Sequence, residues 1–131
     1  MRILIAEDDY TSRKFIYKFL SNYGDCDMVI DGREAVEAYL MGLNTKKEYD
    51  LICLDIMTSD INGYEVLSAI RSIEKQHKIP DELCAKVVMT VTPTNQQHKE
   101  KAFALGCTAF IDKPINSTEF EAVFQQMGMI P

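Results

Sequence analysis

The sequence lacks the features that would direct the protein to a membrane or out of the cell. Its first apolar run, residues 3–6, is far too short for the hydrophobic core of a signal peptide, and Glu7 ends it at once. We therefore expect a cytoplasmic protein that does not associate with a membrane.

The paired spacing of a thiolate metal site is also missing. The chain has four cysteines at irregular spacing with no Cys-x-x-Cys pair, and only two histidines could complete a ligand set. Each cysteine lies in or beside an apolar stretch, so we interpret all four as reduced thiols packed as small hydrophobic side chains. The cysteines are Cys26, Cys53, Cys84 and Cys107. We interpret His77 and His98 as exposed helix residues.

A basic surface is equally absent. The 20 acidic residues outnumber the 14 basic ones and give a net charge of −6. This excess of acid disfavours non-specific attraction to nucleic acid or to anionic lipid. Direct binding to nucleic acid is therefore not expected.

No repeat, low-complexity tract or linker divides the chain, and 131 residues fit one domain that spans residues 1–131. Five short apolar runs predict strands buried on both faces, as in a parallel sheet. These runs are residues 3–6, 27–30, 51–54, 86–90 and 108–111.

Between the predicted strands, apolar residues recur with the period of a helix that buries one face. They fall at 16, 19, 20 and 23, at 36, 39, 40 and 43, and at 120, 123, 124 and 127. A helix is also predicted over residues 64–75, and a weaker one at 102–105 ends before Gly106. Asp31 and Asn116 are expected to cap helices, the latter with Glu119 in a capping box.

Five strands alternating with five helices predict a doubly wound, flavodoxin-like α/β sandwich with the strand order 2-1-3-4-5. Ligands of such folds gather at the carboxyl ends of the strands. The predicted strands end near Glu7-Asp8-Asp9, Asp55, Thr90 and Asp112-Lys113-Pro114, so these side chains should share one edge.

Carboxylates brought close together repel one another, and a bound hard cation relieves the repulsion. Mg²⁺ suits this set, because it prefers oxygen ligands and usually works beside a phosphate. Lys113 and Thr90 would then contact phosphate oxygens, and Asp55 could act as a nucleophile that forms an acyl phosphate. On spacing alone, either adjacent pair of Glu7-Asp8-Asp9 fits the metal.

Four blocks of the sequence, in order, resemble the signature blocks of CheY-like response-regulator receiver domains, and the resemblance covers essentially the whole chain. They are Ile3-Leu4-Ile5-Ala6-Glu7-Asp8-Asp9, Leu54-Asp55-Ile56-Met57 with Asn62-Gly63, Val88-Met89-Thr90, and Phe110-Ile111-Asp112-Lys113-Pro114-Ile115. This chain departs from the family pattern at Ser59, where receivers often have proline.

The resemblance implies that Asp55 is the phosphoacceptor and that Asp55, Asp8, Glu7 through a water, and the backbone carbonyl of Met57 hold Mg²⁺, for which Mn²⁺ should substitute. We choose Glu7 and Asp8 as the acidic pair, because Arg13 then falls where receivers often carry a basic residue; Asp9 becomes a first-turn residue of the helix. Further implied roles are phosphoryl contacts for Thr90 and Lys113, a switch role for Thr90 and Phe110, and a cis peptide between Lys113 and Pro114.

The function implied is a phosphorylation switch rather than a turnover enzyme. Its partners would be a histidine kinase or histidine phosphotransfer protein and an unidentified downstream protein, reached through the fourth helix, fifth strand and fifth helix. We expect a monomer or a weak, phosphorylation-dependent dimer. One alternative is a pseudo-receiver that is never phosphorylated. The other, an aspartyl-phosphate phosphatase, needs an acid where Met57 stands.

Overall fold

The computed structural model describes residues 1–55, 62–91 and 96–129, of which 96–98 are described by their backbone alone. Its centre is a five-stranded parallel sheet in the order β2-β1-β3-β4-β5, as predicted. The strands are β1 (Arg2–Ala6), β2 (Asp25–Val29), β3 (Leu51–Asp55), β4 (Lys86–Val91) and β5 (Ala109–Asp112). The helices are α1 (Tyr10–Leu20), α2 (Gly32–Asn44), α3 (Gly63–Gln76), α4 (Gln96–Ala104) and α5 (Ser117–Gln126), with a short 3₁₀ helix η1 (Asp81–Leu83).

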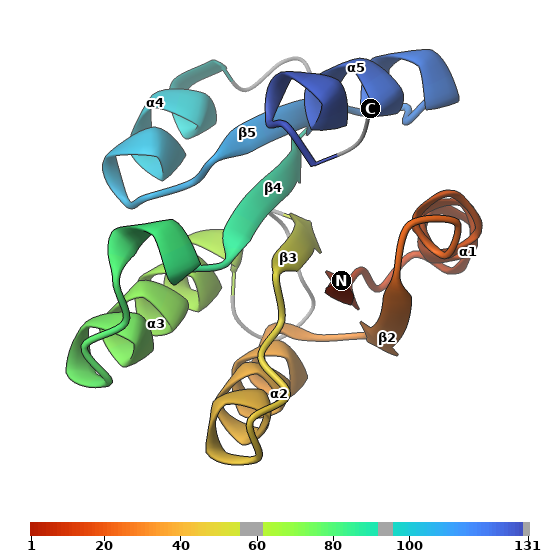
Figure 1. Cartoon of the computed structure of the whole chain (residues 1–131). Helices are drawn as coiled ribbons and strands as arrows, with labels where there is room; N and C mark the ends of the chain where they lie inside the picture. Colours follow the sequence, from red (N-terminus) through yellow and green to blue (C-terminus); the bar gives the residue numbers. More distant parts are fainter. Residues whose placement is uncertain (56–61, 92–95, 130–131) are drawn as a thin grey trace.

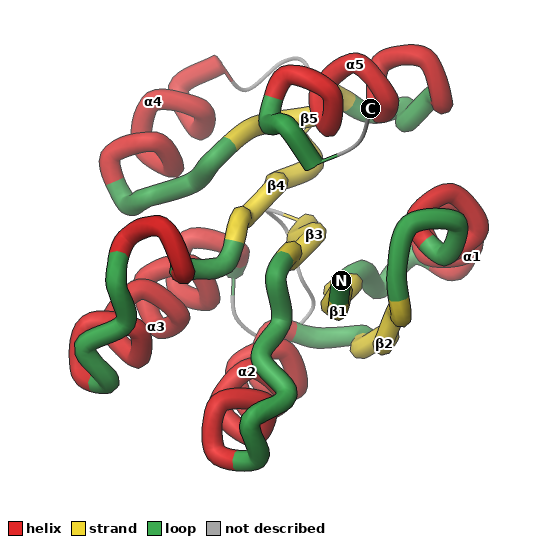
Figure 2. The backbone as a smooth tube through the Cα atoms, viewed as in Figure 1, coloured by secondary structure: helices red, strands yellow, loops and turns green. Residues whose placement is uncertain are grey.

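Helices cover both faces of the sheet (Figure 1). α1 and α5 lie on one face, and α2, α3 and α4 lie on the other. Each face has its own apolar core, with Phe120 and Phe124 of α5 packed on one side and Leu67 and Ile70 of α3 on the other. Figure 2 shows the sheet as the middle layer between these helices. The doubly wound sandwich is therefore confirmed.

Two strands, β2 and β5 at the two edges of the sheet, differ from the prediction that all are buried on both faces, and in β5 only Ile111 is buried. β3 is buried throughout, but β2 contains only exposed and half-buried residues, and Met28 is 47% exposed. Because β2 is an edge strand that pairs only with β1, the aspartates Asp25 and Asp27 can face water there.

Side-chain caps fix where the helices begin. Asp31 accepts a hydrogen bond from the Glu34 amide at 2.9 Å, and Asn116 accepts one from the Glu119 amide at 2.8 Å, so both predicted caps are confirmed. Asp9 was expected inside the first turn of α1. It is instead the cap, because its carboxylate accepts from the Ser12 amide at 2.8 Å.

The remaining differences lie at element ends and on α4. Tyr23 lies beyond the end of α1, and η1 was not predicted. On α4, Ala102 is fully buried while Phe103 is 54% exposed, so only part of the predicted apolar pattern faces the sheet. Gly106 follows α4 with a φ of 102°, a conformation that favours glycine. In the described part of the chain, no helix has the length and apolar character needed to cross a membrane.

Candidate functional site

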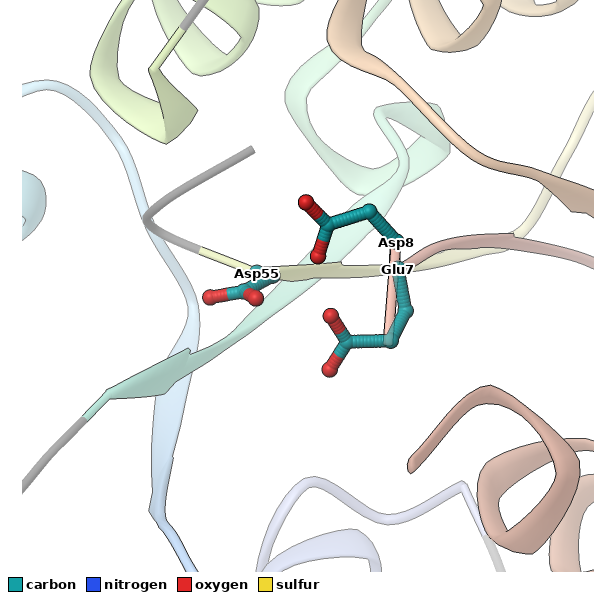
Figure 3. Close-up of side chains that lie close together, drawn as sticks. All are labelled: Glu7, Asp8 and Asp55. Atoms are coloured by element: carbon teal, nitrogen blue, oxygen red, sulfur yellow. The ribbon is translucent and has the colours of Figure 1, made fainter. Parts of the chain in front are cut away.

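Three carboxylates meet at the carboxyl edge of the sheet. Glu7 and Asp8 directly follow β1, and Asp55 is the last residue of β3. Since β1 and β3 are neighbours in register, with Ala6 opposite Leu54, the two strand ends lie side by side. One carboxylate oxygen from each acid lies within 4.8 Å of the others. Figure 3 shows the three carboxylates close together, with those of Asp8 and Glu7 above and below the strand that ends in Asp55.

The three acids differ in exposure. Asp8 is exposed, whereas Glu7 is 1% exposed and Asp55 is 6% exposed. Burial is the main cause that raises the pKa of Glu7 to about 8; the adjacent Asp55 carboxyl adds to the rise, and Lys113 opposes it by a smaller amount. Two buried acids held this close need positive charge beside them to remain ionised together.

Lys113 supplies one such charge. Its Nζ lies 2.9 Å from Oδ2 of Asp55, to which it donates a hydrogen bond, and 3.2 Å from Oε1 of Glu7. Burial lowers the pKa of Lys113, but the hydrogen bond to Asp55 and the charges of both acids outweigh that effect and raise it overall. The Lys113 amide donates to the Val91 carbonyl at 2.7 Å, which anchors this segment to β4. The peptide bond between Lys113 and Pro114 is cis, as the resemblance implies.

Thr90 lies at the same edge. It stands on β4 directly opposite Asp55 of β3 and is 1% exposed. Its hydroxyl oxygen has no hydrogen-bond partner among the described residues. A buried hydroxyl without a partner costs free energy unless a ligand or water satisfies it, so this position suits contact with a bound group.

The donor set fits a hard divalent cation. The three carboxylates offer oxygen ligands from two strand ends, and neither oxygen of the buried Glu7 carboxylate has a hydrogen-bond partner in the described residues, although Lys113 is nearby. Oxygen-only ligands with several carboxylates suit Mg²⁺ or Mn²⁺ rather than a soft metal. Met57, whose carbonyl was expected to join this set, lies outside the described residues, as does Ser59.

Arg13 contacts the acidic pair in a way that the sequence did not indicate. Its Nη1 donates to the backbone carbonyls of Glu7 at 2.9 Å and Asp8 at 3.4 Å. The sequence pattern used Arg13 only to choose between the two acidic pairs. Its contact with the carbonyls depends on how α1 packs beside the end of β1, which no local pattern encodes.

Phe110, the expected switch aromatic, lies on β5 and is only partly buried. Its ring packs edge-on against Phe103 of α4, with centroids 4.8 Å apart and planes at 85°. Lys99 of α4 also forms an ion pair with Asp112 of β5 at 2.9 Å. The ring and charge contacts together hold α4 against β5.

Comparison with known proteins agrees with this geometry. The family model of the response regulator receiver domain matches residues 3–125 of this chain. Hybrid signal transduction histidine kinase B of Dictyostelium discoideum is 32% identical over 124 residues, which make up 90% of this chain but only 6% of the kinase. The chain therefore corresponds to a small part of that relative.

Solved structures show the same fold. The chemotaxis protein CheY4 of Vibrio cholerae superposes with a TM-score of 0.76 at 25% identity, covering 95% of this chain and 96% of that one. A co-crystal structure of the Saccharomyces cerevisiae histidine phosphotransfer protein Ypd1 with the receiver domain of Ssk1 gives a TM-score of 0.80 at 23% identity, covering 99% of this chain and 92% of the matched one. With the family model spanning nearly its whole length, the chain belongs to the response regulator receiver domains.

Proposed function

We propose that this protein is a phosphoacceptor switch of a two-component or phosphorelay system and that Asp55 receives the phosphoryl group. The observation that carries the proposal is the position of the Asp55 carboxylate at the end of β3, hydrogen-bonded to Lys113 and clustered with Glu7 and Asp8. Receiver domains act as signalling switches, so we expect one transfer per signal rather than continuous turnover of a substrate.

In the proposed reaction, a carboxylate oxygen of Asp55 attacks the phosphorus of a phosphohistidine. A phosphorus–oxygen bond forms, the phosphorus–nitrogen bond breaks, and the imidazole nitrogen leaves with the electron pair and takes up a proton. Lys113, already 2.9 Å from Asp55, is placed to neutralise charge on the transferred phosphoryl oxygens. The Thr90 hydroxyl would donate to another of these oxygens.

We place Mg²⁺ at the carboxylates of Glu7, Asp8 and Asp55, with Glu7 acting through a water and the Met57 carbonyl as a further ligand predicted from the sequence. Mn²⁺ should substitute for Mg²⁺. Receiver domains bind Mg²⁺ at an acidic pocket, and when bound the ion shares the negative charge of the phosphoryl group.

The phosphodonor would be a histidine kinase or a histidine phosphotransfer protein, and transfer would take place in the cytoplasm. Support comes from the kinase relative and from the structure that holds Ypd1 with the receiver domain of Ssk1. For output, we propose that phosphorylation draws Thr90 inward, lets Phe110 reorient, and changes the surface of α4, β5 and α5 that a downstream protein or a second copy contacts. The ring contact between Phe103 and Phe110 supports this coupling.

The test is intact-protein mass spectrometry after incubation with Mg²⁺ and either acetyl phosphate or a panel of phosphorylated kinases and phosphotransfer proteins. The variant Asp55→Asn removes the proposed acceptor. Asp81→Asn, at an exposed aspartate of η1, is the matched control with the same chemical change.

We expect one added phosphoryl group in the parent and in Asp81→Asn, labile to base, and none in Asp55→Asn. An adduct that persists in Asp55→Asn would move the acceptor elsewhere. No adduct from any donor, in protein shown to be folded, would replace the proposal with a pseudo-receiver that acts by binding alone.

A further inference from the structure

Arg13 connects α1 to the two residues that carry the acidic pair. It lies in the second turn of α1 and is partly buried. Its Nη1 donates to the carbonyl of Glu7 at 2.9 Å and is 3.4 Å from that of Asp8, so one nitrogen reaches two successive carbonyls at the end of β1. The guanidinium carbon also lies 5.7 Å from the centre of the Tyr10 ring, beside the same turn.

These contacts reach the backbone and not the acidic side chains. Within the described parts of the chain, Arg13 forms no ion pair with Glu7, Asp8 or Asp55, whereas Lys113 forms one with Glu7 and one with Asp55. The two cations therefore have different relations to the site. Lys113 acts on the charge of the carboxylates, and Arg13 acts on the direction in which the backbone presents them.

We propose that Arg13 is a positioning residue for the divalent metal ion. By holding the carbonyls of Glu7 and Asp8, it fixes the turn after β1 and thereby the directions of the two carboxylates. Mg²⁺ demands near-ideal octahedral geometry, so a small rotation of this turn should weaken binding. The inference rests on the proposed function, since it assumes the metal site described above.

The proposal and the simpler view of Arg13 as a nearby positive charge predict opposite signs. A cation that acts only by its charge repels Mg²⁺, so its removal should strengthen Mg²⁺ binding. If Arg13 positions the ligands, its removal should weaken Mg²⁺ binding despite the lost repulsion. A residue needed only for folding would change the stability of the protein and leave the affinity of the folded form unchanged.

The experiment is calorimetric titration with MgCl₂ of the parent, Arg13→Ala, Arg13→Lys and Lys14→Ala, with urea unfolding of each. Lys14 is the control, because it is the neighbouring exposed cation of α1. Loss of an outer contact that orients a metal ligand typically costs about 10-fold to 100-fold in affinity, so we expect about 10-fold weaker binding for Arg13→Ala. Lys14→Ala should bind equally or slightly more tightly.

Arg13→Lys keeps the charge and one donor group but loses the planar guanidinium. Its affinity for Mg²⁺ should therefore lie between that of the parent and that of Arg13→Ala. It also serves as the second variant if Arg13→Ala is poorly folded. Folded Arg13→Ala that binds Mg²⁺ as tightly as the parent, or more tightly, would overturn the inference, as would an equal weakening by Lys14→Ala. If the parent binds no Mg²⁺, the proposed metal site fails and this inference with it.

Discussion

Lys113 is shared between two buried acids, an arrangement that folding alone does not favour. Glu7 and Asp55 are both almost fully buried, and the Lys113 ammonium lies 3.2 Å and 2.9 Å from them. Removing charges from water costs more than one shared cation restores, and apolar side chains would usually stabilise such a position as well or better. Buried, closely spaced charged groups of this kind cluster at functional sites, which agrees with the proposed chemistry.

A second polar contact at the residue scale gives a prediction about pH. Tyr49 is 6% exposed and donates to Oδ2 of Asp27 at 2.6 Å. Burial, with this hydrogen bond, raises the pKa of Tyr49 to about 12. Because the unfolded chain releases this proton at about pH 10, the folded protein binds more protons than the unfolded chain between these values. The stabilisation is therefore complete below pH 10 and is lost as the pH rises towards 12.

Tyr49→Phe should lower the free energy of unfolding by about 1 kcal/mol at neutral pH. This loss is small for a hydrogen bond to a charged group, because the exposed Asp27 carboxylate can bond to water instead. The difference from the parent should shrink as the pH is raised from 10 towards 12. Urea unfolding at several pH values measures this difference, and Tyr17→Phe, at an exposed tyrosine of α1, is the control. A difference that stays constant over this range would contradict the assigned pKa.

At the scale of elements, Glu74 joins α3 to α2 and to the start of β4. It is 2% exposed, and its carboxylate accepts from the Tyr39 hydroxyl at 2.6 Å, the Ala85 amide at 2.8 Å and Arg71 at 2.6 Å. Arg71 also donates to the Gly106 carbonyl at 2.8 Å, which extends the network to the turn after α4. Without Glu74, the Tyr39 hydroxyl and the Ala85 amide would lose this acceptor, whereas Arg71 would keep its backbone acceptors.

We therefore expect Glu74→Ala to lower the free energy of unfolding by about 3 kcal/mol, because it breaks a buried ion pair and leaves buried donors unpaired. Glu74→Gln, which keeps acceptor oxygen but no charge, should cost less. Glu37→Ala, at an exposed acid of α2, is the control. Urea unfolding followed by circular dichroism gives these values, and a loss no larger than that of the control would mean that the network adds little stability.

The elements themselves were largely predictable from the sequence. All five strands were placed to within two residues of their ends, because short apolar runs alternate with amphipathic segments. The exposure of β2 was not predictable, since it depends on the strand being at the edge of the sheet. The hydrogen-bond network around Glu74 was not predicted for a similar reason. The position of an acid within an apolar helix pattern does not indicate which donors the fold will bring to it.

At the scale of the whole molecule, parallel topology explains why the sequence could predict which of the described side chains meet at the candidate site. Every parallel strand ends at the same edge, so Asp8, Asp55, Thr90 and Lys113 meet although they are far apart in the sequence. The sequence could not indicate that Lys113 contacts Glu7 as well as Asp55, or that Arg13 holds the carbonyls behind the acidic pair. Those contacts depend on side-chain packing around the edge.

We expect the same topology to make the free energy of unfolding depend on Mg²⁺. Bringing three carboxylates within 4.8 Å should destabilise the metal-free protein, and a cation that binds only the folded state should stabilise it. Free Mg²⁺ at about 100 times its dissociation constant should add about 2.7 kcal/mol to the free energy of unfolding. Thermal unfolding in Mg²⁺ and in EDTA should therefore differ by several degrees.

Asp8→Asn separates repulsion from binding, because it removes a charge from the cluster and a ligand from the metal site. In EDTA the variant should be more stable than the parent by about 1 kcal/mol, since an exposed carboxylate that repels the buried Asp55 carboxylate is gone. In Mg²⁺ it should lose most of the added stability, while Asp81→Asn behaves as the parent. If Asp8→Asn were less stable than the parent in EDTA, repulsion would not dominate the metal-free site. If it kept the full stabilisation by Mg²⁺, Asp8 would not be a ligand.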